Sequence, residues 1–222
     1  MTAEQDWLAW HERYEDPDSW LAQRLVVVQD RIRRALDAAA PGPIKALSMC
    51  AGQGRDLLGV LEKHPRRDDV AAVLVELDPR NADSARQRAR DLGLSGIEVV
   101  TGDAALTDNY LAHAPADLVL ACGIFGNITN EDIRRTVGHC AALCAPGGTT
   151  VWTRHRKEPD LVPQICDWFA ESGFELEFVT EPGNFGVGVH RRRADAQPKA
   201  LEPGQTMFTF LGYLTMAQRG CE

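Results

Sequence analysis

The chain has 222 residues, of which 44% are hydrophobic and 25% charged, and its formal net charge is -8 at pH 7. These values exclude a disordered or fibrous protein and favour a single α/β domain. The acidic balance argues against nucleic acid as a partner, because a phosphate backbone would be repelled. There is no apolar run of the roughly 20 residues that span a membrane and no secretory signal, so we expect a cytoplasmic protein without a membrane partner.

The six cysteines are scattered along the chain, without a C-x-x-C pair or a histidine at zinc-finger spacing. Cys140 and Cys144 lie four residues apart on one side of an expected helix. We therefore predict buried, reduced thiols and no metal site.

The chain begins with two expected helices. The first covers 7–14, and the second starts after an N-cap at Asp18 or Ser19 and carries an apolar face up to Leu36. From there, apolar runs typical of strands alternate with helical segments. The expected strands are 44–49, 70–77, 97–101, 117–121, 149–153, 174–179 and 207–214. The segment 194–205, rich in Ala, Pro and Gln, predicts a mobile connector.

This alternation favours a parallel, doubly wound sheet, because parallel neighbours need a crossover and the crossover helices then cover both faces. Ligands of such sheets bind outside the carboxyl ends of the strands. The residues that follow each expected strand are therefore the first candidates for a functional site.

Three successive strand ends suggest a nucleoside. After the first strand comes a loop whose glycines allow a sharp turn and close approach of a ligand. That loop consists of Cys50, Ala51, Gly52, Gln53 and Gly54. Glu76, beside Leu77, ends the second strand, where a carboxylate can accept from both ribose hydroxyls. Asp103, followed by Ala104, ends the third and can accept from an adenine amine. The alternatives are a turn without a ligand, a solvated acid and a helix N-cap.

Together these segments resemble the class I methyltransferase family, over about residues 44 to 180. The run 46–56 looks like the family's first motif, whose loop wraps the methionine end of S-adenosyl-L-methionine. By the same resemblance Glu76 is the ribose acid, Asp103 and Ala104 contact adenine, and Cys122 and Gly123 pass beneath the cofactor. The chain departs from the family at Ser48, where an acid is usual, and at Cys50, where a glycine is frequent.

The resemblance implies an α/β fold: a doubly wound, mostly parallel seven-stranded sheet with a C-terminal antiparallel hairpin and N-terminal lid helices. We expect one methyltransferase domain over 1–222. Its parts would be N-terminal helices in 1–40, a cofactor-binding core in 44–180, and the hairpin with a connector in 181–222.

Two other classes of protein share parts of this pattern. A dinucleotide oxidoreductase needs G-x-G-x-x-G, but Leu57 stands at the third glycine position. A non-catalytic module that only holds the nucleoside remains an alternative, since the loop departs from the family at Ser48 and Cys50.

Methyl transfer from a sulfonium is an in-line displacement that needs alignment of the acceptor and at most one base. Candidates for catalysis are His155 after the fifth strand, His190 in a segment expected to fold over the pocket, and Tyr14 on the first helix. A surface histidine in a basic turn is the alternative for His155.

Asn127 follows the fourth strand and can orient an acceptor, although forming a turn beside Gly126 explains it as well. Arg154 and Arg191 belong to two late basic clusters. If both clusters border one pocket, an anionic small molecule is the expected acceptor; solvated faces are the alternative. RNA is the second candidate acceptor, on the same two clusters.

Overall fold

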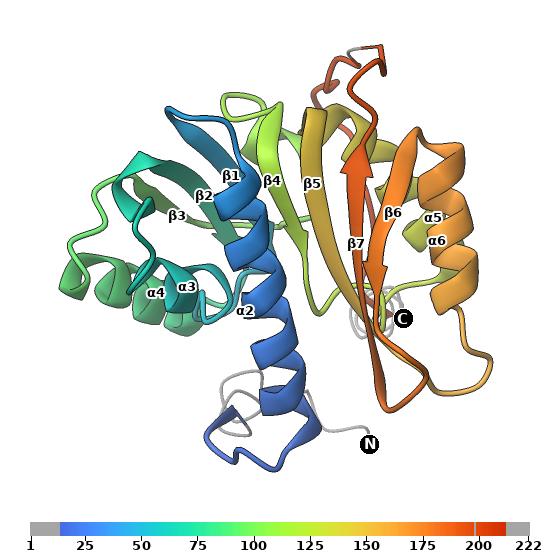
Figure 1. Ribbon diagram of the computed structural model, residues 1–222, viewed down its shortest axis with the longest axis horizontal. Coiled ribbons are helices and arrows are strands. Elements are labelled where there is room, and N and C mark those ends of the chain that lie inside the picture. The colour runs from blue at the N-terminus through green and yellow to red at the C-terminus, as the bar shows by residue number, and fades with distance from the viewer. Residues whose placement is uncertain (1–13, 198, 212–222) are drawn as a thin grey trace, which may run out of the picture.

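The computed structural model describes residues 14–197 and 199–211. Its centre is a seven-stranded sheet with the strand order β3-β2-β1-β4-β5-β7-β6 (Figure 1). The strands are β1 Ile44–Met49, β2 Val70–Glu76, β3 Ile97–Thr101, β4 Ala116–Ala121, β5 Cys144–His155, β6 Phe174–Val179 and β7 Phe185–Arg192. The strands β1 to β5 pair in parallel, and β7 is antiparallel to both β5 and β6. The expected α/β, mostly parallel fold is confirmed.

Helices cover both faces of the sheet. They are α2 Trp20–Ala38, α3 Leu57–Leu61, α4 Pro79–Asp91, α5 Asn130–Leu143 and α6 Val162–Glu171. One core lies between the sheet and α2, α3 and α4, and the other lies under α5 and α6. The strand order reverses between β1 and β4, because β1 leads to β2 and β3 on one side and β4 leads to β5 on the other. Ligands of doubly wound sheets bind at such a switch point.

Capping residues place the helices as expected. The Ser19 side chain accepts from Ala22 N at 3.1 Å and begins α2, and the Thr129 hydroxyl accepts from Asp132 N at 3.1 Å and begins α5. The start of α2 lies at the same end of the sheet as the carboxyl ends of β4 and β5 (Figure 1). The first turns of α2 are thus positioned to cover the candidate site. The helix expected over 7–14 lies outside the described residues except for Tyr14.

The C-terminal hairpin differs from the prediction. Its strands are β6 and β7, so the expected strand 207–214 is wrong over its described part, where 207–210 form no strand. The segment around His190 was expected to fold over the pocket and is instead buried strand in β7. The glycines of β7 explain this: a Cβ at Gly188 would stand 2.2 Å from Trp152 Cε2, so the strand packs directly on that indole.

A second difference concerns the segment after β3. The expected helix after Asp103 is only a 3₁₀ turn, Thr107–Tyr110. The face beside it is completed by residues 199–211, which we call the C-terminal strap; its Met207 and Phe208 are buried in the core under α5 and α6. Met207 N donates to Ala105 O at 2.8 Å, and Leu211 N donates to Asn127 O at 2.9 Å. The strap therefore links the loop after β3 to the loop after β4.

Asp132 in the first turn of α5 anchors this strap. One carboxylate oxygen accepts from Thr209 N at 3.0 Å, and the other accepts from the Arg135 guanidinium. We expect Asp132→Ala to lower the free energy of unfolding by about 2 kcal/mol, because hydrogen bonds to a charged group are lost and a buried amide loses its acceptor. The variant should also be cut faster by protease within 199–211. Urea unfolding and limited proteolysis measure both effects. Glu131→Ala, which removes the neighbouring exposed acid, is the matched control, and equal behaviour of the two variants would rule out the anchoring role.

In the part of the chain that the structure describes, no helix is long and apolar enough to cross a membrane. Within the same residues, no group of three or more His, Cys, Asp and Glu side chains is placed to hold a metal ion.

Candidate functional site

The loop after β1 is a tight turn at the carboxyl end of the sheet. Gly54 N donates to Ala51 O at 2.8 Å, and Cys50, Gly52 and Gly54 all have positive φ, of 52°, 55° and 68°. Cys50 thus adopts the left-handed conformation that suits glycine, at the position where the family often has one. A Cβ at Gly54 would meet Leu58 Cδ1 at 2.8 Å, so core packing, and not only a ligand, requires this glycine.

Glu76 at the end of β2 holds this loop. Its carboxylate is buried and accepts from Gly52 N at 2.8 Å through Oε2 and from Asp78 N at 2.9 Å through Oε1. A carboxylate oxygen has two lone pairs, so each retains one for a further donor. Glu76 can therefore support the glycine loop and accept from two ribose hydroxyls at the same time.

Asp103 after β3 lies near the same loop. Its Oδ1 accepts from Ala105 N at 2.9 Å, and its backbone oxygen accepts from the Asn109 amide at 2.8 Å. Burial raises the pKa of the Cys50 thiol well above its usual value, and the charges of Glu76 and Asp103 raise it further. Gly102 N donates to Glu76 O at 2.9 Å and Ala51 N donates to Val75 O at 3.0 Å, so the three strand ends lie side by side. Asp103 thus closes its own turn with one oxygen and keeps the other for an external donor.

The surroundings of these carboxylates fit an adenosine. Leu77, next to Glu76, is an exposed apolar side chain with 44% of its surface accessible, which offers a contact for a ring or a ribose face. Ala104 is buried, and its backbone oxygen accepts from Tyr110 Oη at 2.9 Å, so the turn beside Asp103 is fixed. Gly123 after β4 has a φ of 83°, and no atom lies within 4 Å of a Cβ built there. Hydrogen-bond acceptors, apolar surface and open backbone are thus gathered at the carboxyl ends of β1 to β4.

Gln53 connects the loop to its neighbours. Its Nε2 donates to Asn81 Oδ1 at 3.4 Å, and its Oε1 accepts from Arg55 Nε at 3.0 Å. Arg55 in turn pairs with Glu15 at 2.7 Å and lies 5.5 Å from the Tyr14 ring. The segment before α2 is therefore tied directly to the glycine loop.

Three of the predicted acceptor-side residues lie at the ends of β4 and β5. Asn127 Nδ2 donates to Gly123 O at 2.8 Å, which is the turn-forming role. The Arg154 guanidinium is buried and donates to Phe125 O, so it supports the same loop. His155 lies over Gly126, where a Cβ would meet its Cδ2 at 3.2 Å.

The environment of His155 sets its protonation. Burial lowers its pKa, and the charges of Arg154 and Lys157 lower it further, so the ring is neutral at pH 7. His155 Nδ1 accepts from Lys157 N at 3.2 Å, which leaves the proton of the neutral ring on Nε2. In this tautomer His155 offers a hydrogen-bond donor to the space after β4.

His190 and Arg191 do not lie where the sequence predicted them. His190 is fully buried in β7, its Nδ1 accepts from Trp152 Nε1 at 3.0 Å, and its ring stacks on Phe169 with centroids 4.3 Å apart. Arg191 pairs in register with Thr149, while Arg154 pairs with Gly186. The two basic clusters are thus separated by about 16 Å along β5 and do not border one pocket. Arg191 instead pairs with Glu177 at 3.6 Å.

Sequence analysis did not identify Arg24, which lies at the start of α2 and is only 8% exposed. Its Nη2 donates to Tyr14 Oη at 3.3 Å, and its Cζ lies 5.3 Å from the centre of the Trp20 ring. Its position was a usable signal, because Leu21, Arg24 and Val28 fall on one helical face, and that face is buried.

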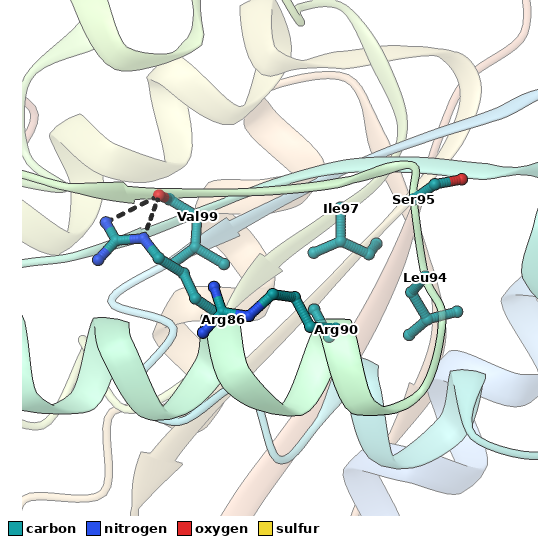
Figure 2. Close-up of a pocket in the computed structure, with 7 residues that line it drawn as sticks. Arg86, Arg90, Leu94, Ser95, Ile97 and Val99 are labelled. Carbon is teal, nitrogen blue, oxygen red and sulfur yellow. Dashed lines mark hydrogen bonds between the residues drawn. The ribbon is translucent and has the colours of Figure 1, made fainter.

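A hollow between α4 and the edge strand β3 is a separate feature (Figure 2). There Arg86 donates from Nε and Nη2 to Val99 O, at 3.1 and 2.9 Å. This side chain of α4 thus occupies a carbonyl of the edge strand β3 and covers part of an edge that could pair with another sheet. Neither the glycine loop 50–54 nor Glu76 or Asp103 lines this hollow.

The strand order and the antiparallel β7 give the fold that the chain shares with solved methyltransferase structures. Residues 47–150 match a family model described as a methyltransferase domain. The part of the chain that runs from β1 into β5 is thus similar to methyltransferase domains. No curated protein matches the chain.

Solved structures agree in fold. An O-methyltransferase family protein from Burkholderia thailandensis is 19% identical with a TM-score of 0.63, over 79% of this chain and 57% of that one. The CurJ carbon methyltransferase is 16% identical with a TM-score of 0.63, over 82% and 57%. Magnesium protoporphyrin IX methyltransferase from Synechocystis PCC 6803, with bound S-adenosylmethionine, is 13% identical with a TM-score of 0.60, over 82% and 89%. The chain thus spans 57% of the length of the first two proteins.

Proposed function

We propose that the chain transfers the methyl group of S-adenosyl-L-methionine to a small-molecule acceptor. The observation that carries the proposal is the convergence of the glycine loop, Glu76 and Asp103 at the carboxyl ends of three adjacent strands. One neighbour of the same fold is named as a magnesium protoporphyrin IX methyltransferase, and the small molecule in that name supports an acceptor of this class.

In this proposal Glu76 holds the ribose and Asp103 holds the adenine amine. The loop 50–54 and Gly123 lie beside the methionine end, and the acceptor enters next to His155 and Asn127. The bound cofactor supplies an activated methyl group. The protein has to align the acceptor with that group and keep water out. His155, neutral and protonated on Nε2, would orient an acceptor oxygen or nitrogen by donating to it.

RNA is less well supported as an acceptor than the sequence alone suggested. The two late basic clusters lie far apart, and in the second of them Arg191 and Arg193 pair with Glu177 and Glu175. The combined positive surface on which the RNA alternative rested is therefore absent among the described residues.

The test is release of S-adenosylhomocysteine from S-adenosyl-L-methionine with a panel of small phenols, carboxylic acids and amines, and separately with total RNA. We expect release to depend on a small molecule. Release with RNA alone would refute the proposal. Tight binding of S-adenosylhomocysteine without release on a broad panel would favour the non-catalytic binding module.

Once an acceptor is found, we expect His155→Ala to lower kcat/KM about tenfold or more, because one oriented hydrogen bond to the reacting group is lost. Binding of S-adenosylhomocysteine should stay unchanged, since His155 lies on the acceptor side. His113→Ala is the control, because His113 pairs with Glu98 near the amino end of β3, whereas the acceptor side lies at the carboxyl ends of β4 and β5. An equal loss of cofactor affinity and turnover would contradict the assignment.

A further inference from the structure

His155, the first candidate for a base, is placed to donate a hydrogen bond and not to take a proton. Its Nδ1 accepts from Lys157 N at 3.2 Å, so the proton of the neutral ring lies on Nε2. A Cβ at Gly126 would stand 3.2 Å from Cδ2 and 3.8 Å from Nε2, so this edge of the ring lies over the loop after β4. A second proton on the ring would cost the bond from Lys157 N.

The acids after β5 do not supply a base to this loop either. Asp160 is the acid whose charge acts on His155. Its carboxylate is engaged, because it accepts from Arg156 Nη1 at 2.6 Å and from Val162 N, in the first turn of α6, at 2.9 Å. Glu158 is exposed and is not among the charges that act on His155.

The titratable groups near the end of β4 are also engaged or protonated. Asp56 caps α3 by accepting from Leu57 N at 2.7 Å, and Arg24 is the cation beside it. A proton on Asp56 would weaken the cap and the attraction to Arg24. Burial raises the pKa of the Tyr14 hydroxyl and of the Cys122 thiol, so both keep their protons at neutral pH.

The cations after β5 favour a negatively charged group beside His155. Arg154 and Lys157 are close enough to His155 for their charges to lower its pKa. In the described part of the chain neither of them forms an ion pair, whereas Arg156 holds Asp160. An anion at the Nε2–H edge of His155 thus gains a hydrogen bond and the attraction of two positive charges.

We propose, on the basis of the methyltransferase function above, that the group methylated is a carboxylate and that the product is a methyl ester. A carboxylic acid has an ordinary pKa of about 4, so it is ionised at neutral pH without the help of a base. Thiols, phenols and amines have values of about 8.5 to 10 and have to lose a proton first. The engaged acids and the donating histidine suit only the first of these acceptors.

The reaction then needs no proton transfer. One carboxylate oxygen forms a bond to the methyl carbon, while the other accepts from His155 Nε2–H. The bond between this carbon and sulfur breaks, and its electron pair stays on sulfur. A negative carboxylate and a positive sulfonium thus give a neutral ester and a neutral thioether. A hydroxyl acceptor would release one proton in every turnover instead.

Binding to the protein saturated with S-adenosylhomocysteine tests the acceptor class without turnover. The probes are benzoate, phenylacetate and indole-3-acetate, each compared with the uncharged primary amide of the same skeleton. Calorimetry should find an acid that binds about tenfold or more tightly than its amide. His155→Ala should remove most of this preference, and His155→Gln, which keeps an N–H donor, should recover part of it. His113→Ala is the matched control and should leave it unchanged.

Turnover with S-adenosyl-L-methionine completes the test. The acid that binds should give its methyl ester without release of a proton in a weakly buffered assay. Its kcat/KM should stay constant between about pH 7 and pH 8.5, because no group of the protein has to lose a proton. The primary alcohol of the same skeleton should give no ether.

Several outcomes would overturn the inference. They are amides that bind as tightly as the acids, a failure of all three acids to bind, a bound acid that gives no ester, and an alcohol, phenol or amine that is methylated in preference to the acids. A kcat/KM that rises with pH would overturn it too, since it reveals a base. A protein that binds no S-adenosylhomocysteine counts against the proposed function instead, and the comparison of acids with amides, repeated without nucleoside, then decides the acceptor class alone.

Discussion

Replacing Glu76 with alanine should weaken the binding of S-adenosylhomocysteine by about 100-fold or more. Two ribose hydroxyls lose a charged acceptor, and each such hydrogen bond contributes about 1.5–3 kcal/mol. In addition, Gly52 N and Asp78 N lose the carboxylate that now fixes them at 2.8 and 2.9 Å, so the glycine loop is no longer held against β2. Titration calorimetry measures the effect directly.

Two further variants make this result specific. Glu76→Gln keeps one acceptor oxygen but turns an amide donor toward one of the two backbone N–H groups. Its affinity for S-adenosylhomocysteine should therefore lie between those of the wild type and Glu76→Ala. Glu98→Ala removes an exposed carboxylate from the adjacent strand β3 and should bind like the wild type. If Glu76→Ala retained affinity within about threefold of the wild type, the ribose assignment would be untenable.

Acidification should destabilise the protein through His190. Burial lowers the pKa of this histidine to about 4 from the ordinary 6.5, so the folded state keeps it neutral. The unfolded chain binds a proton below about pH 6.5, and the folded chain does not do so until about pH 4. Stability is therefore complete above pH 6.5 and falls as the pH drops through this window. The total loss from this one group is about 3 kcal/mol.

Urea unfolding at pH 7.5, 6 and 5 measures this slope. His190→Phe preserves the stack on Phe169 but leaves Trp152 Nε1 without its acceptor, whereas His190→Gln can keep an acceptor and loses the stack. The two variants differ in packing and share the loss of the titrating ring. Both should show a flatter pH dependence than the wild type, whatever their absolute stability. A wild-type slope in both variants would show that other groups carry the effect.

The strands β1 and β2 and the residues at their carboxyl ends were predictable, because the sequence patterns that indicate them lie within a few neighbouring residues. The strands β1 and β2 are apolar runs buried on both faces, and such runs stand out from the polar loops that follow them. The caps of α2 and α5 are also local, since a hydroxyl and its partner amide lie three residues apart. Once the order of strands and helices was fixed, the parallel topology brought the loop after β1 and Glu76 together without further information.

The strand β7 and the segment after Met207 were harder to predict, because contacts between residues far apart in the sequence determine their structure. The strand β7 contains Gly186 and Gly188, which suggest a loop in the sequence, but the structure fills the missing side-chain volume with Val162 and Trp152. Conversely, the apolar run that begins at Met207 suggests a strand, yet the side chains of Arg135 and Thr136 satisfy Met207 O. In both cases the contacting residues are distant in the sequence, so the residues next to β7 or Met207 in the chain do not indicate them.

The two cysteines at the ends of β1 and β4 have a chemical consequence under the proposed function, in which the protein holds an alkylating sulfonium. A thiolate is a strong nucleophile, and one next to a methyl sulfonium would compete with the intended acceptor. Burial raises the pKa of both Cys50 and Cys122 well above the ordinary thiol value, and nearby carboxylates add to the rise. Both sulfurs therefore stay protonated at neutral pH. Under the proposed function, the same desolvation would keep both thiols from competing with the acceptor for the methyl group.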